Sequence, residues 1–158
     1  MKTQTLLLSS LMALASFALC HAEDEKITLE QAPANIQKAI KHLAGSNKII
    51  RIEKAHDDGK IEYEALTEKS NGKKIEFIIK ADGTLDSTEE RLDKNELSSD
   101  VAKTVESAVA GGKIHAIERI TKEGVVTYEV AYKTAKGDKQ EAVISSQGKL
   151  LKNGADNG

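Results

Sequence analysis

The chain contains an internal repeat, and this repeat limits its fold more than any other feature of the sequence. Residues 36–86 align without a gap with residues 101–151, which lie 65 positions further along. Fourteen of the aligned positions are identical, and many others exchange one apolar residue for another. A solenoid unit is shorter, at roughly 20–50 residues. We therefore expect each copy to be a small folding unit rather than one turn of a solenoid.

Each copy begins with the pattern of an amphipathic helix and continues with alternating segments typical of antiparallel strands. Apolar residues recur at helical spacing from Ile36 to Ala44 and from Leu97 to Val109. Glycine-containing turns separate the later segments, as in hairpins. The sequence therefore predicts an α+β fold of two tandem repeats, each with one helix and then a three- to four-stranded antiparallel meander, and with the helices on one sheet face. The expected strands are 48–54, 61–67, 73–80, 84–85, 113–120, 126–133, 139–145 and 149–151.

The first 22 residues have the basic start, apolar stretch and small final residue of a secretory signal peptide. Cleavage after Ala22 would leave repeat 1 at 23–90, repeat 2 at 91–152 and a flexible tail at 153–158, with Ser87–Lys94 as a polar connection. Lipid anchoring at Cys20 fits poorly, because Leu19 stands where lipoprotein sites place a small residue. We expect a periplasmic or secreted protein with no transmembrane segment in the mature chain.

Composition argues against several classes of function. Without the signal, which contributes only Lys2, the chain has 22 basic and 25 acidic residues. This balance and the 3% of aromatic residues provide neither a basic surface nor a stacking platform for nucleic acid. Loss of Cys20 leaves no thiol, and His42, His56 and His115 are not at metal-ligand spacing. We expect no cofactor, no metal site and no enzymatic activity.

Glutamates recur at equivalent strand positions in the two copies. If Tyr63 packs under the first helix, its strand neighbour Glu64 points to the opposite face of the sheet. The same alternation places six glutamates on that face: Glu53, Glu64, Glu76, Glu118, Glu129 and Glu141. They form either a solvated surface with cross-strand salt bridges or a binding surface for a cationic or extended partner. Ile78 and Val143 favour the binding surface, because on this face they would be exposed unless a partner covers them.

The same short motifs occur in the same order in both copies. In copy one they are Lys48-Ile49, Ile52-Glu53, Gly59, Tyr63-Glu64, Gly72-Lys73 and Asp82-Gly83-Thr84-Leu85. In copy two they are Gly112-Lys113-Ile114, Ile117-Glu118, Gly124, Tyr128-Glu129-Val130, Gly137 and Gly148-Lys149-Leu150. The order of these motifs resembles the PepSY-like domains, and more narrowly the secreted tandem proteins whose fold is similar to beta-lactamase inhibitory protein. The resemblance covers nearly all of residues 27–152, and copy two departs from the pattern at Gln140 and Gln147.

The resemblance implies a noncatalytic envelope or extracellular module with no catalytic residues to transfer. Relatives regulate or inhibit proteases, and in the inhibitor-like fold a concave sheet grips a partner protein. We therefore expect a protein partner in the cell envelope, bound through the six glutamates. The alternative is a small-ligand or calcium-responsive envelope protein, because Asp57, Asp58 and Asp82 lie at turns whose oxygens suit calcium.

Overall fold

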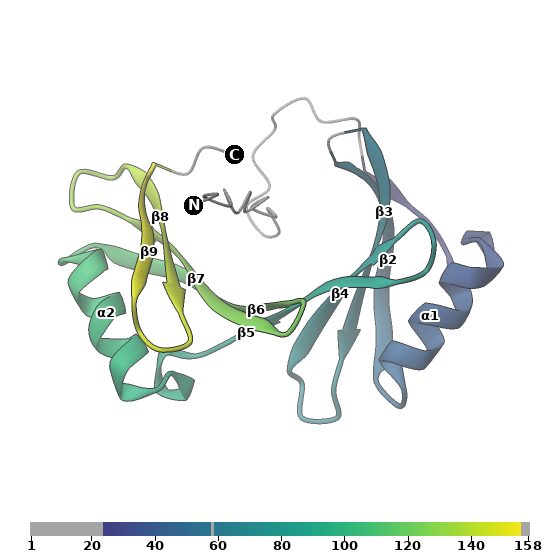
Figure 1. The fold of residues 1–158 in the computed structure, drawn as a ribbon, viewed down its shortest axis with the longest axis horizontal. Helices are drawn as coiled ribbons and strands as arrows, with labels where there is room; N and C mark the ends of the chain where they lie inside the picture. The colour runs from purple at the N-terminus through teal and green to yellow at the C-terminus, as the bar shows by residue number, and fades with distance from the viewer. Residues whose placement is uncertain (1–23, 58, 156–158) are drawn as a thin grey trace, which may run out of the picture.

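The protein is described here by a computed structural model that covers residues 24–57 and 59–155. In this part of the chain nine antiparallel strands form one sheet, and each strand lies beside its neighbour in the sequence, from β1 to β9. Figure 1 shows the sheet curved into a trough, with β5 and β6 in its middle. The strands are β1 (Glu25–Lys26), β2 (Lys48–Asp57), β3 (Lys60–Glu68), β4 (Lys74–Lys80), β5 (Leu85–Arg91), β6 (Lys113–Lys122), β7 (Val125–Lys133), β8 (Lys139–Ser145) and β9 (Leu150–Ala155).

Two α-helices, α1 (Ala34–Ala44) and α2 (Ser99–Val109), lie against the outer, convex face of the trough (Figure 1). A short 3-10 helix precedes each of them, at Leu29–Gln31 and Lys94–Glu96. The Ser98 side chain caps α2 by accepting a hydrogen bond from the backbone N–H of Val101. We define the outer face as the face that carries the helices and the inner face as the concave one opposite.

The apolar stripes predicted for the helices are the surfaces that α1 and α2 bury against the sheet. Ile36 and Ile40 of α1, and Val101 and Val105 of α2, are fully buried. They belong to two hydrophobic clusters, one beneath each helix. Burial of this apolar surface is the main favourable term in folding, so each helix is fixed to its own half of the sheet.

The predicted fold class is wrong: the chain is mostly one nine-stranded sheet with two α-helices, not two tandem helix-plus-meander repeats. The helices and most strands lie close to the predicted ranges, but the segment expected as a connection, Ser87–Lys94, contains most of β5. Strand β5 pairs with β6 from Ser87 opposite Lys122 to Arg91 opposite Glu118. This pairing satisfies backbone groups that two separate meanders would leave at open edges.

The C-terminal part of the sheet extends further than the sequence indicated. Strand β9 reaches Ala155, so residues 153–155 of the predicted tail are hydrogen-bonded to β8. Gly148, in the turn before β9, has a φ of 78°, and a Cβ atom there would lie 2.8 Å from the Asp100 carbonyl carbon. The Thr104 hydroxyl donates a 2.6 Å hydrogen bond to the Gly148 carbonyl. The last hairpin is therefore packed tightly against α2.

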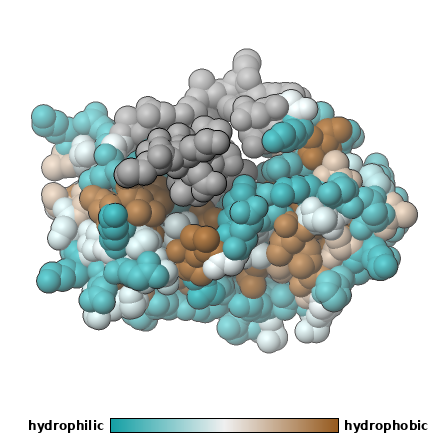
Figure 2. All heavy atoms as spheres, viewed as in Figure 1, coloured by the Kyte–Doolittle hydropathy of each residue, from teal (hydrophilic) through white to brown (hydrophobic). Residues whose placement is uncertain are grey.

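The surface seen in the orientation of Figure 1 is largely hydrophilic, and its hydrophobic residues form separate patches (Figure 2). None of the helices in the described part of the chain is both long and apolar enough to cross a membrane. The signal peptide of residues 1–22, its cleavage after Ala22 and the lipid attachment considered at Cys20 lie outside the described residues.

Candidate interaction surface on the inner sheet face

All six glutamates of the predicted binding set lie on the inner face of the sheet. Side chains alternate between the two faces along β3. Tyr63 and Ala65 belong to the hydrophobic cluster beneath α1 on the outer face, so Glu64 between them lies on the inner face. The remaining five follow from the register of the neighbouring strands. The six are spread over β2, β3, β4, β6, β7 and β8: Glu53, Glu64, Glu76, Glu118, Glu129 and Glu141.

The sheet places several of these glutamates directly opposite one another. Glu53 pairs in register with Glu64, and Glu118 pairs with Glu129. Side chains at directly opposed positions lie within reach of each other, and like charges there are destabilising. The structure therefore brings together groups that repel one another when ionised.

A seventh glutamate, Glu89 of β5, lies on the same face and was missed by the sequence analysis. It stands directly opposite Glu76, so a third glutamate pair occupies the middle of the sheet. Glu89 has no glutamate counterpart in the repeat, since Gly154 occupies the equivalent position. The available signal was the Asp82-Gly83 turn, because a hairpin turn requires a full strand after it. We call the seven side chains the glutamate surface: Glu53, Glu64, Glu76, Glu89, Glu118, Glu129 and Glu141.

Burial of these side chains differs from that of an ordinary solvated sheet surface. Glu53, Glu64, Glu76 and Glu89 are only 8%, 9%, 4% and 5% exposed, and the other three are half-buried. The apolar residues expected to be exposed on this face, Ile78 and Val143, are 0% and 2% exposed. The interpretation as a fully solvated face is therefore wrong for its centre, and the inner face is more enclosed than alternation alone predicts.

Cations of the chain neutralise only part of the glutamate surface. The Arg51 guanidinium lies 3.1 Å from a carboxylate oxygen of Glu53 and 3.1 Å from one of Glu76. Lys152 lies 3.5 Å from Glu141. Within the described part of the chain, Glu64, Glu89 and Glu118 form no ion pair.

The three glutamates without an ion pair have raised pKa values. Burial is the main cause for Glu64, whose pKa rises to about 7, and the carboxylates of Glu76, Asp24 and Glu53 act in the same direction. Burial also raises the pKa of Glu118 to about 7, although Arg91 opposes the shift.

Glu89 is the most strongly perturbed of the three. Burial, followed by the charge of Glu118 and then of Glu76, raises its pKa to about 9. Its Oε1 atom is the one buried side-chain oxygen or nitrogen without a hydrogen-bond partner in the part of the chain that the structure describes. A buried acceptor left unsatisfied costs about 1–3 kcal/mol.

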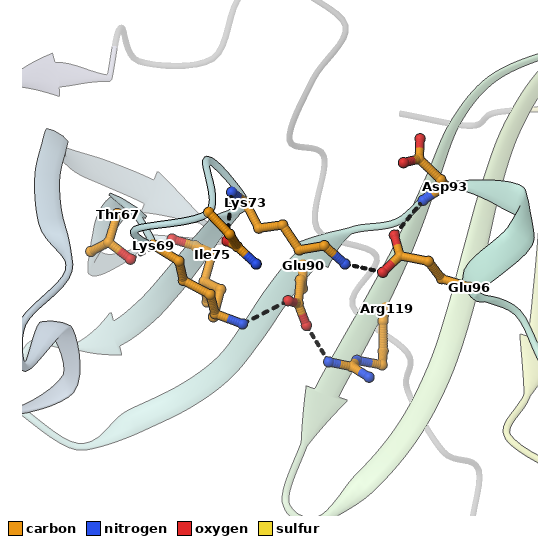
Figure 3. A network of polar contacts seen from close by, with 9 residues as sticks. Thr67, Lys69, Lys73, Ile75, Glu90, Asp93, Glu96 and Arg119 are labelled. Carbon is orange, nitrogen blue, oxygen red and sulfur yellow. Dashed lines mark hydrogen bonds and ion pairs between the residues drawn. The ribbon is translucent and has the colours of Figure 1, made fainter.

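The next residue, Glu90, shows the opposite arrangement on the outer face. Its two carboxylate oxygens pair with Lys69, at 2.8 Å, and with Arg119 (Figure 3). Although burial alone would raise the pKa of Glu90, the hydrogen bond from Lys69 and the charge of Arg119 lower it below its ordinary value. Figure 3 also shows the pair of Lys73 and Glu96 beside this network. Both oxygens of Glu90 are thus paired on the outer face, whereas its neighbour Glu89 on the inner face forms no ion pair with any described residue.

Metal chemistry receives no geometric support from the described residues. They contain no group of three or more His, Cys, Asp or Glu side chains placed to hold an ion. Of the aspartates considered for calcium, Asp58 lies outside the described residues. Asp82 Oδ1 accepts hydrogen bonds from the Thr84 backbone N–H and hydroxyl, at 2.9 and 2.6 Å, as turn aspartates commonly do.

The fold is similar to that of several solved Bacteroides structures. A DUF2874 family protein from Bacteroides ovatus has a TM-score of 0.66 and 20% identity, over 78% of this chain and 87% of its own. A BLIP-like protein from Bacteroides fragilis has a TM-score of 0.65 and 20% identity, over 80% and 87%. A protein from Bacteroides eggerthii, named as periplasmic, has a TM-score of 0.67 and 16% identity, over 80% and 93%.

These similarities confirm the resemblance to the inhibitory-protein fold at the level of architecture. No protein family model matches the sequence, and no curated protein matches it either. Membership of the PepSY-like family therefore stays a prediction from the motifs quoted above.

Proposed function

We propose that this protein is an exported, noncatalytic binding module of the cell envelope, and that its inner sheet face binds a partner protein. The observation that carries the proposal is the glutamate surface itself. It occupies the centre of a concave face, opposite the helices. It places glutamates directly opposite one another, and within the described residues Glu64, Glu89 and Glu118 form no ion pair. Such an arrangement costs folding stability, and binding energy from a partner offers a physical reason for it.

Two further observations support the envelope location and the regulatory role. The first 22 residues have the composition of a secretory signal, and a structure of similar fold is named as periplasmic. Another similar structure is named BLIP-like, which agrees with the resemblance of the sequence motifs to proteins with the fold of beta-lactamase inhibitory protein. We extend the proposal on this basis to regulation or inhibition of an envelope enzyme, such as a protease, by occlusion.

The test begins with capture of partners from native envelope extract on the immobilised exported chain. The Glu64→Arg/Glu129→Arg variant reverses charge at two inner-face positions. The matched control, Glu30→Arg/Glu106→Arg, makes the same change in net charge at two exposed positions outside the glutamate surface. Circular dichroism and thermal melting establish that both variants fold.

The proposal predicts one retained protein that binds the wild type and the control but not the inner-face variant. That protein is then purified, and its affinity for the three chains is measured by calorimetry. Equal binding by all three chains, or retention of no protein by the wild type, contradicts the proposed function.

A further inference from the structure

The middle of the inner face contains a buried carboxyl group, that of Glu89, which forms no ion pair in the part of the chain that the structure describes. Glu89 is 5% exposed, and its Oε1 atom has no hydrogen-bond partner within the described residues. The carboxylate directly opposite belongs to Glu76, which is already bonded to Arg51. The electrostatic repulsion from Glu118, Glu129 and Glu64 also acts on Glu89.

The chain satisfies an equivalent carboxylate one residue away, so Glu89 is not unpaired for lack of suitable neighbours. Glu90 is 7% exposed, about as buried as Glu89, and it receives Lys69 from one side and Arg119 from the other (Figure 3). Removing a buried ion-pair partner is strongly destabilising in most proteins. The unpaired state of Glu89 therefore points to a cation supplied from outside the chain.

The geometry favours an organic cation over a metal ion. The glutamates belong to different strands, and no three acidic or histidine groups of the described chain converge closely enough to ligate a metal. A guanidinium has five N–H donors in a planar fork and can satisfy two opposed carboxylates at once. A lysine ammonium provides three donors and can satisfy one.

The acidic positions extend across the sheet rather than forming a single point. Glu64, Glu76, Glu89, Glu118 and Glu129 occupy five consecutive strands, β3 to β7. Neighbouring strands lie about 4.8 Å apart, so these five positions span roughly 19 Å. A span of this length matches a polypeptide segment with several basic residues better than it matches a single small ion.

We propose that the partner of the inner face is a basic polypeptide segment, and that one of its arginine or lysine side chains binds between Glu89, the directly opposite Glu76 of β4 and the diagonally placed Glu118 of β6. The proposal rests on the proposed function and names the chemistry of its partner. The bound cation donates to the unsatisfied Oε1 of Glu89, and flanking basic residues lie near Glu64 and Glu129.

The probe for this proposal is a hexa-arginine peptide, with hexa-glutamate as the opposite charge control. Binding to the exported chain is measured by calorimetry at physiological and at higher salt. The informative variant is Glu89→Gln, which removes the ionisable carboxyl group but keeps the shape of the side chain. Glu106→Gln makes the same substitution at an exposed position of α2, away from the inner face.

We expect Glu89→Gln to weaken peptide binding by roughly tenfold or more, and Glu106→Gln to change it less than about twofold. Glu89→Gln should also raise the melting temperature, which separates a lost contact from a damaged fold. Equal weakening by both variants would show that only net charge matters and would overturn the proposal. Protection of the chain against melting by millimolar calcium, without binding of the peptide, would also overturn it, because the occupant would be a metal ion.

Failure of this inference can be told apart from failure of the proposed function. If a captured envelope partner no longer binds the Glu64→Arg/Glu129→Arg variant but still binds Glu89→Gln, the inner face remains the binding face. The cation proposed to bind at Glu89 is then ruled out. If peptide binding depends on Glu89 but no protein is captured from the extract, binding of a cation at Glu89 is supported and the proposed function is contradicted.

Discussion

Substitution of Glu89 by glutamine should stabilise the protein, and the gain should grow with pH. The pKa of Glu89 is raised from the ordinary 4.5 to about 9 in the folded chain. Because the pKa of this carboxyl group is higher in the folded chain, the unfolded chain loses the proton at a lower pH than the folded chain does. The stability that protonated Glu89 contributes is therefore fully present below pH about 4.5 and is lost progressively as the pH rises toward 9.

The size of the effect follows from the interval between the pH and the unfolded pKa. Each pH unit above 4.5 and below 9 lowers the stability of the wild type by about 1.4 kcal/mol through this one group. The loss is under about 1 kcal/mol at pH 5 and at most about 3.5 kcal/mol at pH 7. Glutamine cannot ionise and can donate its amide hydrogens to the carboxylate of Glu76, so the variant avoids the loss.

The assay is urea unfolding of the wild type and Glu89→Gln at pH 5 and pH 7. Comparing the two chains at each pH isolates Glu89 from Glu64 and Glu118, whose raised pKa values give the wild type a similar trend. Glu90→Gln is the matched control, because it removes a carboxylate that Lys69 and Arg119 already satisfy and should destabilise the fold at pH 7. A Glu89→Gln variant that is less stable than the wild type at pH 7, or a difference independent of pH, would refute the reasoning.

Two further predictions test the packing of the two halves of the sheet. Tyr63→Ala should lower the free energy of unfolding, measured in urea, by about 3 kcal/mol or more, because Tyr63 is 6% exposed in the cluster beneath α1. Tyr128→Ala should lower it less, because Tyr128 is half-buried. Equal losses in the two variants would contradict this packing. Gly148→Ala should lower the melting temperature more than Gly137→Ala, since both have positive φ but only Gly148 would place a Cβ against the Asp100 backbone. Equal melting temperatures of the two alanine variants would show that the last hairpin does not press against α2.

Local patterns were enough to predict most of the elements. The apolar stripe of α1, with Ile36 and Ile40 buried, follows from helical spacing alone. The inner-face position of Glu64 and Glu129 follows from alternation along β3 and β7. These features depend only on residues close in the sequence, which is why a single sequence is sufficient for them.

The continuity of the sheet could not be predicted in the same way. Strand β5 carries Ser87, Glu89 and Arg91 on one side and Thr88 and Glu90 on the other, so it has no apolar alternation to identify it as a strand. Its place in the sheet comes from pairing with β4 and β6, which are contacts distant in sequence. The misassignment of this segment as a connection led both to the wrong fold class and to the omission of Glu89.

The burial of the glutamate surface also could not be predicted from the alternation of residues in the sequence. Alternation predicts which side of the sheet Glu53 and Glu76 occupy, but it does not predict how enclosed that side becomes when the sheet curves. Ile78, on the same inner face, is also buried. Because a glutamate at a strand position is usually solvated, the sequence favoured a surface of weak salt bridges.

The most direct test of a binding role for the inner face is a comparison of thiol labelling rates on its two sides. The only cysteine, Cys20, lies within the expected signal peptide, so a single cysteine can be placed on either face of the exported chain. Thr127→Cys reports from the inner face beside Glu129, and Thr121→Cys reports from the outer face of the adjacent strand. Addition of the partner captured from the envelope should slow labelling of Thr127→Cys and leave Thr121→Cys unchanged. Slower labelling at Thr121→Cys alone, or at neither position, would contradict a binding role for the inner face.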